Sequence, residues 1–94
     1  MADSDERTAR DVTVHGAVQG VGFRFRCGQE AERLGVLGWI RNEPDGTVAG
    51  HFEGPAEAVE ALVDWCRRGP SHADVACVES EAAVPSGARA FSVE

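Results

Sequence analysis

The stretch DVTVHGAVQGVGFR, residues 11–24, combines a strand, a glycine loop and the start of a helix. Residues 11–15 alternate between polar and apolar side chains, and this period of two predicts a half-buried strand. Residues 16–22 contain three glycines and predict a loop. Helical spacing of apolar residues begins at Phe23, so the stretch predicts a strand, a loop and a helix in direct succession.

The apolar stripe of the first helix predicts its extent and its buried face. It consists of Phe23, Cys27, Ala31 and Leu34. Gly28 weakens the helix, because glycine inside a helix costs about 1 kcal/mol relative to alanine. Gly35 stands where a left-handed C-terminal cap is favoured, so we expect the helix to end just before it.

Two strands joined by a tight turn are expected next. They cover residues 36–42 and 47–53, and the turn between them contains the pair Asp45-Gly46. Both residue types tolerate positive φ, so the pair is a strong signal for a hairpin. Asn42 is then the last residue of the first of these strands.

A second amphipathic helix follows Pro55, at a position where a helix accepts proline without losing a hydrogen bond. Its apolar stripe consists of Val59, Leu62, Val63 and Cys66. The pair Gly69-Pro70 ends this helix. Residues 73–81 predict a fourth strand, and residues 91–93 predict a short final one.

The predicted order of elements is β-α-β-β-α-β followed by the short strand. Because each helix has one apolar stripe, both helices are expected on one face of a single sheet. The predicted fold class is therefore α+β, a ferredoxin-like βαββαβ sandwich with a mostly antiparallel sheet of four to five strands. We expect residues 10–94 to form the domain and residues 1–9 to be a flexible, acidic N-terminal tail. The fold by itself implies no function.

Composition and charge exclude several classes of protein. The formal net charge of −7 disfavours nucleic-acid binding, which relies on basic residues. The sequence contains no lysine, and both Schiff-base chemistry and Walker-type phosphate loops require one. No apolar run approaches the ~20 residues of a membrane span, and the polar N-terminus is unlike a signal peptide. We therefore expect a cytoplasmic protein with no membrane and no nucleic-acid partner.

The cysteines, histidines and tryptophans are expected to have structural roles. Buried, reduced thiols are expected at the three widely spaced cysteines, which are Cys27, Cys66 and Cys77. A surface or structural role is expected for the dispersed histidines, which are His15, His51 and His72. The core is expected to hold both tryptophans, Trp39 and Trp65. We therefore expect no metal site.

The loop of residues 16–22 is the first candidate site. Glycines allow backbone N–H groups to converge on an anion, and the unpaired N–H groups at the start of the next helix add to them. Arg24 follows in the first turn of that helix, and its guanidinium can bind two phosphate oxygens at once. Alternatively, the glycines form only a tight turn and Arg24 is solvated. Spacing alone leaves both interpretations open.

Asn42 is the second candidate. Asparagine commonly caps turns at strand ends, and that role would be sufficient to explain it. Beside a bound phosphate, however, its amide could hold a water molecule in position for attack.

Two longer motifs make the sequence recognisable: HGAVQGVGFR at residues 15–24 and LGVLGWIRN at residues 34–42. They resemble the phosphate-loop signature and the second signature of the acylphosphatase family, and the resemblance covers residues 10–93. It implies hydrolysis of the carboxyl-phosphate bond of acylphosphates to carboxylate and inorganic phosphate, without a metal and without a cofactor.

The resemblance also implies roles for individual residues. Arg24 and the loop would hold the phosphate, the loop through Gln19, Gly20, Val21, Gly22 and Phe23. Asn42 would position the water. The expected partners are a small acylphosphate substrate and inorganic phosphate as product and inhibitor, and the expected state is a monomer.

Three other functions stay open at this point. A non-catalytic anion-binding module would keep the loop but would not need Asn42. An accessory domain, of the kind at the start of hydrogenase-maturation proteins, would be followed by cysteine-rich zinc segments. A ferredoxin-like RNA-binding domain is disfavoured by the acidic charge and by the lack of paired aromatic residues on the central strands.

Overall fold

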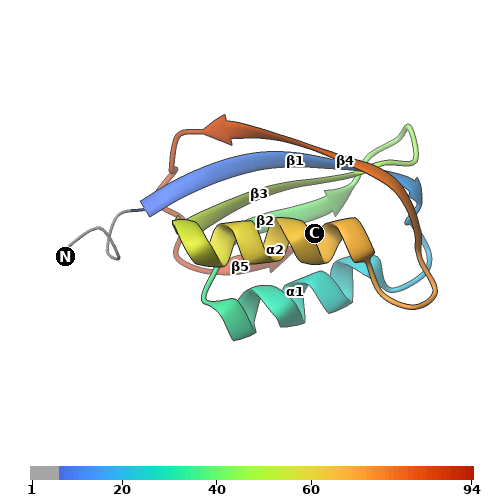
Figure 1. The fold of residues 1–94 in the computed structure, drawn as a ribbon, viewed down its shortest axis with the longest axis horizontal. Coiled ribbons are helices and arrows are strands. Elements are labelled where there is room, and N and C mark those ends of the chain that lie inside the picture. The colour runs from blue at the N-terminus through green and yellow to red at the C-terminus, as the bar shows by residue number, and fades with distance from the viewer. Residues whose placement is uncertain (1–6) are drawn as a thin grey trace.

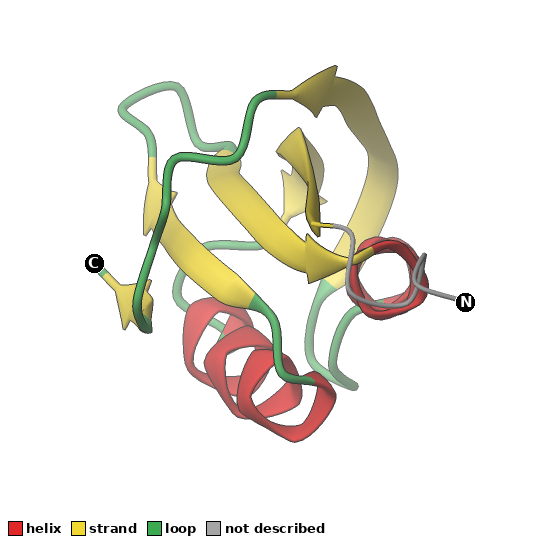
Figure 2. Ribbon diagram, turned by 90° about the vertical axis from the view of Figure 1, so that its left-hand side faces the viewer, coloured by secondary structure: helices red, strands yellow, loops and turns green. Residues whose placement is uncertain are grey.

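The computed structural model describes residues 7–94 as one five-stranded sheet with two helices on one face (Figure 1; Figure 2). The strands are β1 (Arg7–Ala17), β2 (Leu37–Asn42), β3 (Val48–Pro55), β4 (Asp74–Ala83) and β5 (Phe91–Val93), and the helices are α1 (Phe23–Leu34) and α2 (Ala56–Arg68). The strand order is β4-β1-β3-β2-β5, with β2 and β5 parallel and the other neighbours antiparallel. The predicted ferredoxin-like fold is confirmed.

β1 begins earlier than the sequence pattern indicates. Of the predicted tail, residues 1–6 lie outside the described residues, whereas residues 7–9 belong to β1, so assigning them to a tail is wrong. Arg7 pairs with Pro55 of β3, and Ala9 is 4% exposed. These residues lack the alternation of a half-buried strand, so their extended conformation depends on the neighbouring strand rather than on their own pattern.

At its other end, β1 continues past His15 to Ala17 through a shift in register against β4. Gly16 at this shift has φ of 129°, and a Cβ there would lie 2.2 Å from the backbone oxygen of Asp74. Glycine is required here because β4 approaches so closely. The loop that leads to α1 therefore begins at Val18, later than the sequence pattern predicts.

The core lies between the sheet and the two helices, and the predicted stripes supply half of its buried residues. The whole predicted stripe of α2 is buried, whereas in α1 the last member, Leu34, is only partly buried. The ring of Phe23 lies 5.3 Å from that of Trp65, which packs against the core as expected. The sheet contributes Val12, Val14, Ile40, Val48 and Phe52. Within residues 7–94, neither helix is long and apolar enough to cross a membrane.

Trp39 does not lie in the core, contrary to expectation. Side chains alternate along β2, so that buried Gly38 and Ile40 face the helices and Trp39 faces away from them. Its ring stacks on that of His51 at 6.4 Å, and the Arg41 guanidinium lies 4.5 Å from its centre. The indole is therefore part of a polar cluster on the outer face of the sheet.

The cysteines are all free, but they are not all buried. Cys27 and Cys66 are buried, as predicted, whereas Cys77 is exposed on β4, which is an edge strand. Hydrogen bonding with Cys66, together with burial, raises the pKa of the Cys27 thiol, so that it stays protonated. Cys27 therefore packs in the core as a small apolar residue.

Glu53 is fully buried on the outer face of the sheet, beneath the segment that leads into β5. Its carboxylate accepts hydrogen bonds from Ser86 Oγ at 2.6 Å and from the backbone amides of Ser86, Gly87 and Ala88. It also lies 2.6 Å from Nε2 of His51. Burial alone would raise the pKa of Glu53, but the hydrogen bonds from Ser86, His51 and Ala88 lower it to about 2. This carboxylate therefore fastens the segment that carries β5 back to the sheet.

Candidate active site

The loop between β1 and α1 is built on two left-handed glycines. Gly20 and Gly22 have φ values of 76° and 81°, and Gly22 is the N-cap of α1. A Cβ at either position would meet nothing within 4 Å, so glycine is required for the backbone angle and not for space. The glycines that the sequence analysis singled out therefore determine the path of the backbone.

The loop and the first turn of α1 present unpaired backbone donors. Among the described residues of the chain, the N–H groups from Gly20 to Phe25 have no hydrogen-bond acceptor, and the first backbone bond of α1 runs from Arg26 to Gly22 at 3.0 Å. Such donors carry the positive end of the helix dipole and bind anions. They lie at a hollow of about 160 Å³ lined by Val18, Gly20, Gly22, Phe23, Arg24, Phe25 and Val93, which we call the loop hollow.

Arg24 lines the loop hollow from the first turn of α1. Its guanidinium donates a hydrogen bond to the backbone oxygen of Glu94, immediately after β5. That end of the chain is held to β2 by parallel pairing and by a 2.9 Å bond from the Glu94 amide to the Ile40 oxygen. Val93 and Glu94 are thus site residues that sequence reasoning missed, because no motif in residues 84–94 marks them.

Of the predicted phosphate-binding set, Gln19 and Val21 do not line the loop hollow, whereas Phe23 does. The Gln19 amide group donates hydrogen bonds to the backbone oxygens of Glu43 at 2.8 Å and Thr47 at 2.9 Å, which ties the loop to the turn between β2 and β3. Val21 packs against the core, and the ring of Phe23 is 1% exposed. The side chains of Gln19 and Val21 are therefore engaged elsewhere in the fold.

Asn42 is the last residue of β2 and is exposed, but it is not among the residues that line the loop hollow. The turn after it is capped by another residue: Asp45 Oδ1 accepts from the Thr47 amide at 3.0 Å and from the Thr47 hydroxyl at 2.7 Å. Within the part of the chain that the structure describes, the Asn42 side chain makes no hydrogen bond. Capping of the turn therefore does not account for Asn42.

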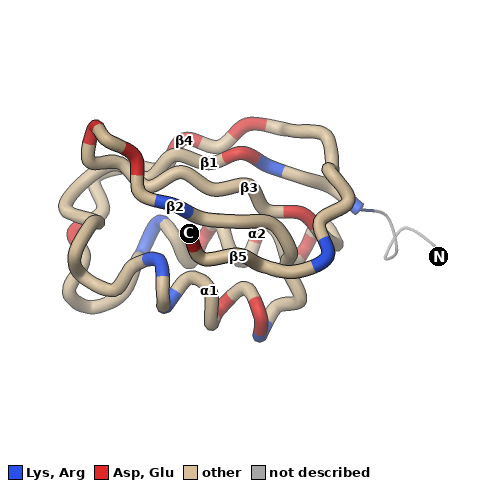
Figure 3. Tube along the Cα trace, turned by 180° about the vertical axis from the view of Figure 1, so that it is seen from behind, with Lys and Arg blue, Asp and Glu red and all other residues tan. Residues whose placement is uncertain are grey.

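Basic side chains gather near the loop hollow although the chain is acidic overall. Figure 3 shows arginine positions at the start of α1 and on β2, while acidic positions occur on β4 and in the turn between β2 and β3. Arg41 of β2 is paired with Glu43 at 2.6 Å, which leaves Arg24 as the basic group in the loop hollow. Within residues 7–94, no group of three or more His, Cys, Asp or Glu side chains is placed to hold a metal ion.

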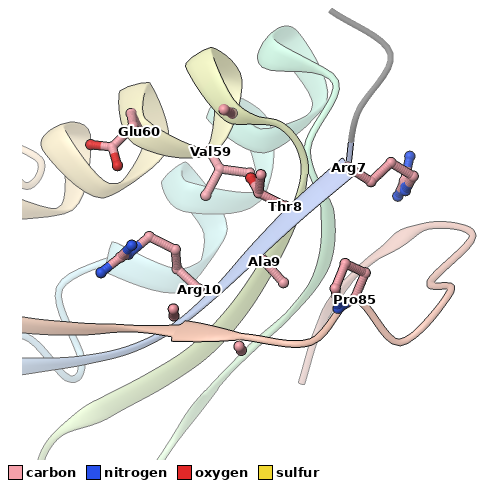
Figure 4. Close-up of a pocket in the computed structure, with 10 residues that line it drawn as sticks. Arg7, Thr8, Ala9, Arg10, Val59, Glu60 and Pro85 are labelled. Atoms are coloured by element: carbon pink, nitrogen blue, oxygen red, sulfur yellow. The ribbon is translucent and has the colours of Figure 1, made fainter. Parts of the chain in front are cut away.

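A larger hollow, of about 450 Å³, lies at the end of β1 that is opposite the glycine loop (Figure 4). Figure 4 shows that β1 contributes Thr8, Ala9 and Arg10 to its lining and that α2 contributes Val59 and Glu60. The Arg10 guanidinium is engaged by Ser80, Nε lying 2.6 Å from Oγ. This hollow contains none of the glycine-loop residues, so size alone does not identify the site.

Comparison with known proteins agrees with the geometry. The acylphosphatase family model matches residues 10–93. An acylphosphatase from Nocardioides sp. is 55% identical over 91 residues, which are 97% of this chain and 92% of that protein. The solved structure of an acylphosphatase from Coxiella burnetii superposes with a TM-score of 0.90 at 35% identity, covering 94% of this chain and 93% of the other.

The same fold also occurs as a small part of a much longer protein. The structure of HypF from T. kodakarensis matches 93% of this chain with a TM-score of 0.80 at 28% identity, but this chain covers 12% of that protein. The stand-alone relatives are matched over almost their whole length. The chain therefore belongs to the acylphosphatase family and is an enzyme that hydrolyses the carboxyl-phosphate bond of acylphosphates.

Proposed function

We propose that the loop N–H groups and Arg24 together bind the phosphate of the substrate, and that Asn42 orients the attacking water. The observation that carries this proposal is the loop hollow, where one guanidinium and backbone donors that have no acceptor among residues 7–94 line the same space. Gln19, Gly20, Val21, Gly22 and Phe23 act through their backbone. The Arg24 guanidinium adds a positive charge and two parallel donors.

The chemical steps need little more than this. In phosphoryl transfer, catalysis consists mainly of positioning and of stabilising the charge on the equatorial oxygens. The water oxygen forms a bond to phosphorus while the bond between phosphorus and the acyl oxygen breaks. The carboxylate departs with the electron pair, and it is a good leaving group that needs no strong acid. Asparagine is not a base near neutral pH, so the water proton passes to a phosphate oxygen.

Asn42 acts from the turn side of the site. The bonds from Gln19 to Glu43 and Thr47 connect this turn to the loop, and Asn42 directly precedes Glu43. Its amide is free of the turn hydrogen bonds that Asp45 makes. An amide that both donates and accepts can hold water in one orientation.

We propose that the reaction is independent of metal ions. The donors of the loop hollow are N–H groups, which bind an anion directly and repel a cation. The test is hydrolysis of benzoyl phosphate in the presence and absence of EDTA. We expect equal rates, and a loss of activity that Mg²⁺ restores would refute this part of the proposal.

We further propose that the sheet and its two helices, residues 7–94, form the catalytic unit, that the enzyme acts as a monomer in the cytoplasm, and that inorganic phosphate inhibits it as a product. The three free cysteines suit a reducing compartment. Phosphate retains the oxygens that the loop and Arg24 bind, so it competes with the substrate. Competitive inhibition by phosphate, together with sedimentation of the active species as a monomer, tests these points.

A further inference from the structure

A second hollow adjoins the loop hollow along α1. It has a volume of about 200 Å³ and is lined by Phe25, Gly28, Gln29, Glu32, Phe91 and Val93; we call it the α1–β5 groove. Phe25 and Val93 line both hollows. The groove therefore starts where the phosphate-binding donors end and runs along the outside of the helix.

Three of the six residues that line the groove are large and apolar: Phe25, Phe91 and Val93. The side chain of Phe25 is 64% exposed and that of Val93 is 46% exposed, and both are large apolar residues. Phe91 forms the inner wall, where it packs against the core with its ring 6.0 Å from that of Phe52. Exposed apolar surface that gathers in one place, beside a polar site, is typical of ligand binding.

Gly28 keeps the groove open. A Cβ at this position would lie 2.6 Å from a methyl carbon of Val93, so a larger residue would either push β5 away or fill the space. This explains why glycine stands inside α1 despite its cost to helix stability. The glycine lets β5 approach the helix while the groove between Phe25 and Val93 remains open.

We propose that the α1–β5 groove binds the acyl part of the substrate and favours acylphosphates with an aromatic or extended apolar acyl group. This inference rests on the proposed function, because it places the phosphate in the loop hollow. A substrate held there by its phosphate carries its acyl group into the space next to the donors, and the groove is the apolar continuation of that space. An apolar cavity of about 150 Å³ accommodates benzene in another protein, so the groove has room for one aromatic ring.

Glu32 gives the groove a second kind of selectivity. It is exposed and is the one charged residue among those that line the groove. Its carboxylate repels an acyl group that ends in a second negative charge and tolerates a neutral one. The preferred class is therefore a neutral aromatic or aliphatic acylphosphate, and an acylphosphate with a terminal carboxylate is a poorer substrate.

The test compares kcat/KM for benzoyl phosphate with kcat/KM for acetyl phosphate in four proteins: wild type, Phe25→Ala, Val93→Ala and Val84→Ala. Val84 is the matched control, because it is 82% exposed and lies outside the groove. The benzoyl-to-acetyl ratio cancels any effect of a substitution on phosphate binding. We expect Phe25→Ala and Val93→Ala to lower this ratio about two- to tenfold, the range that corresponds to one aromatic or apolar contact, and Val84→Ala to leave it unchanged.

A second comparison tests the charge. With succinyl phosphate, Glu32→Gln is expected to raise kcat/KM about two- to fivefold, the range for one exposed charge pair, while Glu60→Gln on α2 is the control and has no effect. An equal response of both variants would overturn the role of Glu32.

The outcomes separate this inference from the function on which it rests. An unchanged benzoyl-to-acetyl ratio in both groove variants, with inhibition by inorganic phosphate intact, would overturn the acyl subsite and leave phosphate binding in place. A dimer of the wild type that Phe25→Ala dissociates, seen by sedimentation at the assay concentration, would assign the groove to a second copy of the chain instead. Full activity of Arg24→Gln would contradict the proposed function itself.

Discussion

Gln19 Nε2 lies 2.8 Å from the backbone oxygen of Glu43, and this hydrogen bond joins the glycine loop to the turn that follows Asn42. The same nitrogen lies 2.9 Å from the Thr47 oxygen, so one side chain spans both ends of the turn. The proposed phosphate-binding and water-orienting groups are thus connected by a hydrogen bond, although they are far apart in the sequence.

Replacement of Gln19 by alanine is expected to loosen this connection. Two hydrogen bonds are lost, which corresponds to about 1–3 kcal/mol of unfolding free energy. We expect kcat to fall by about tenfold because Asn42 is no longer held in register with the loop. The inhibition constant of phosphate changes less, because the loop amides stay in place. Equal losses in kcat and in phosphate affinity would show that Gln19 shapes the loop alone.

Arg24→Gln is expected to reduce turnover by at least about 10²-fold, since a charged donor at the transferring phosphoryl group is lost. Inhibition by phosphate weakens in parallel. Arg24→Lys restores little activity, because an ammonium group lacks the two parallel donors of a guanidinium. Arg33→Gln, in the last turn of the same helix, is the control and keeps normal activity. Turnover of Arg24→Gln within a few-fold of wild type would exclude the assigned role.

Asn42→Ala is expected to lower kcat by about 10²–10³, as when one preorganised polar group is removed, with the phosphate inhibition constant almost unchanged. The matched substitution is Asp45→Ala, because Asp45 makes the hydrogen bonds that cap the turn. Asp45→Ala is expected to cost about 1 kcal/mol of stability and to leave kcat near that of wild type. Measuring kcat and the denaturation midpoint for both proteins distinguishes a catalytic role of Asn42 from a structural role in the turn. A stable, fully active Asn42→Ala protein would refute the mechanism.

Gly20→Val is expected to weaken phosphate binding through the backbone. Gly20 has φ of 76° with nothing within 4 Å of a Cβ, so the cost is conformational, about 1–2 kcal/mol, and not a clash. The rise in Tm that inorganic phosphate produces shrinks, because a ligand stabilises only the state that binds it. Gly35→Val is the control, because Gly35 has φ of 77° and equally open surroundings. It loses similar stability but retains the full phosphate effect.

Glu53 makes stability depend on pH at the acidic end. Its folded pKa of about 2 is below its ordinary value of 4.5, so the unfolded chain binds the proton more readily. The stabilisation is complete above the unfolded pKa and is lost as the pH falls toward 2. Glu53→Gln lacks this part of the acid sensitivity, which denaturant midpoints between pH 5 and pH 2 will show. Glu79→Gln, an exposed control, is expected to behave like wild type.

His51 makes the stability of the fold decrease as the pH rises, which is opposite to the effect of Glu53. It lies between Asp11, with Nδ1 2.6 Å from Oδ1, and Glu53. Burial alone would lower the pKa of His51, but the hydrogen bonds with Asp11 and Glu53 raise it above its ordinary value of 6.5. The stabilisation from charged His51 is therefore complete below pH 6.5 and is lost as the pH rises through the raised pKa. The nuclear magnetic resonance titration of the His51 ring checks the direction of this shift.

Local sequence determined most of the fold. The apolar stripes of α1 and α2, the Asp45-Gly46 turn and the glycines of the loop are each set by interactions within a few residues. Apolar residues that recur every 3.6 residues in a helix, or every 2 residues in a strand, indicate which face of the element is buried. The order of the helices and strands, and the packing of both helices on one face of the sheet, could therefore be predicted from the sequence alone. The candidate site was implied differently, by the resemblance of the two signature motifs to the acylphosphatase family, which indicated Arg24, the loop and Asn42.

Only the tertiary structure determined which distant segments complete the site and which residues leave the core. Residues 7–9 become strand because β3 offers them partners, and Trp39 faces outward because of the register of β2. Val93 reaches the loop because β5 pairs with β2 in parallel, and Glu53 fastens the segment before it. These relationships depend on contacts between residues far apart in the sequence. The periodicity of apolar residues indicates which face of one segment is buried, but not which distant segment packs against that face. These contacts therefore could not be predicted from the sequence pattern.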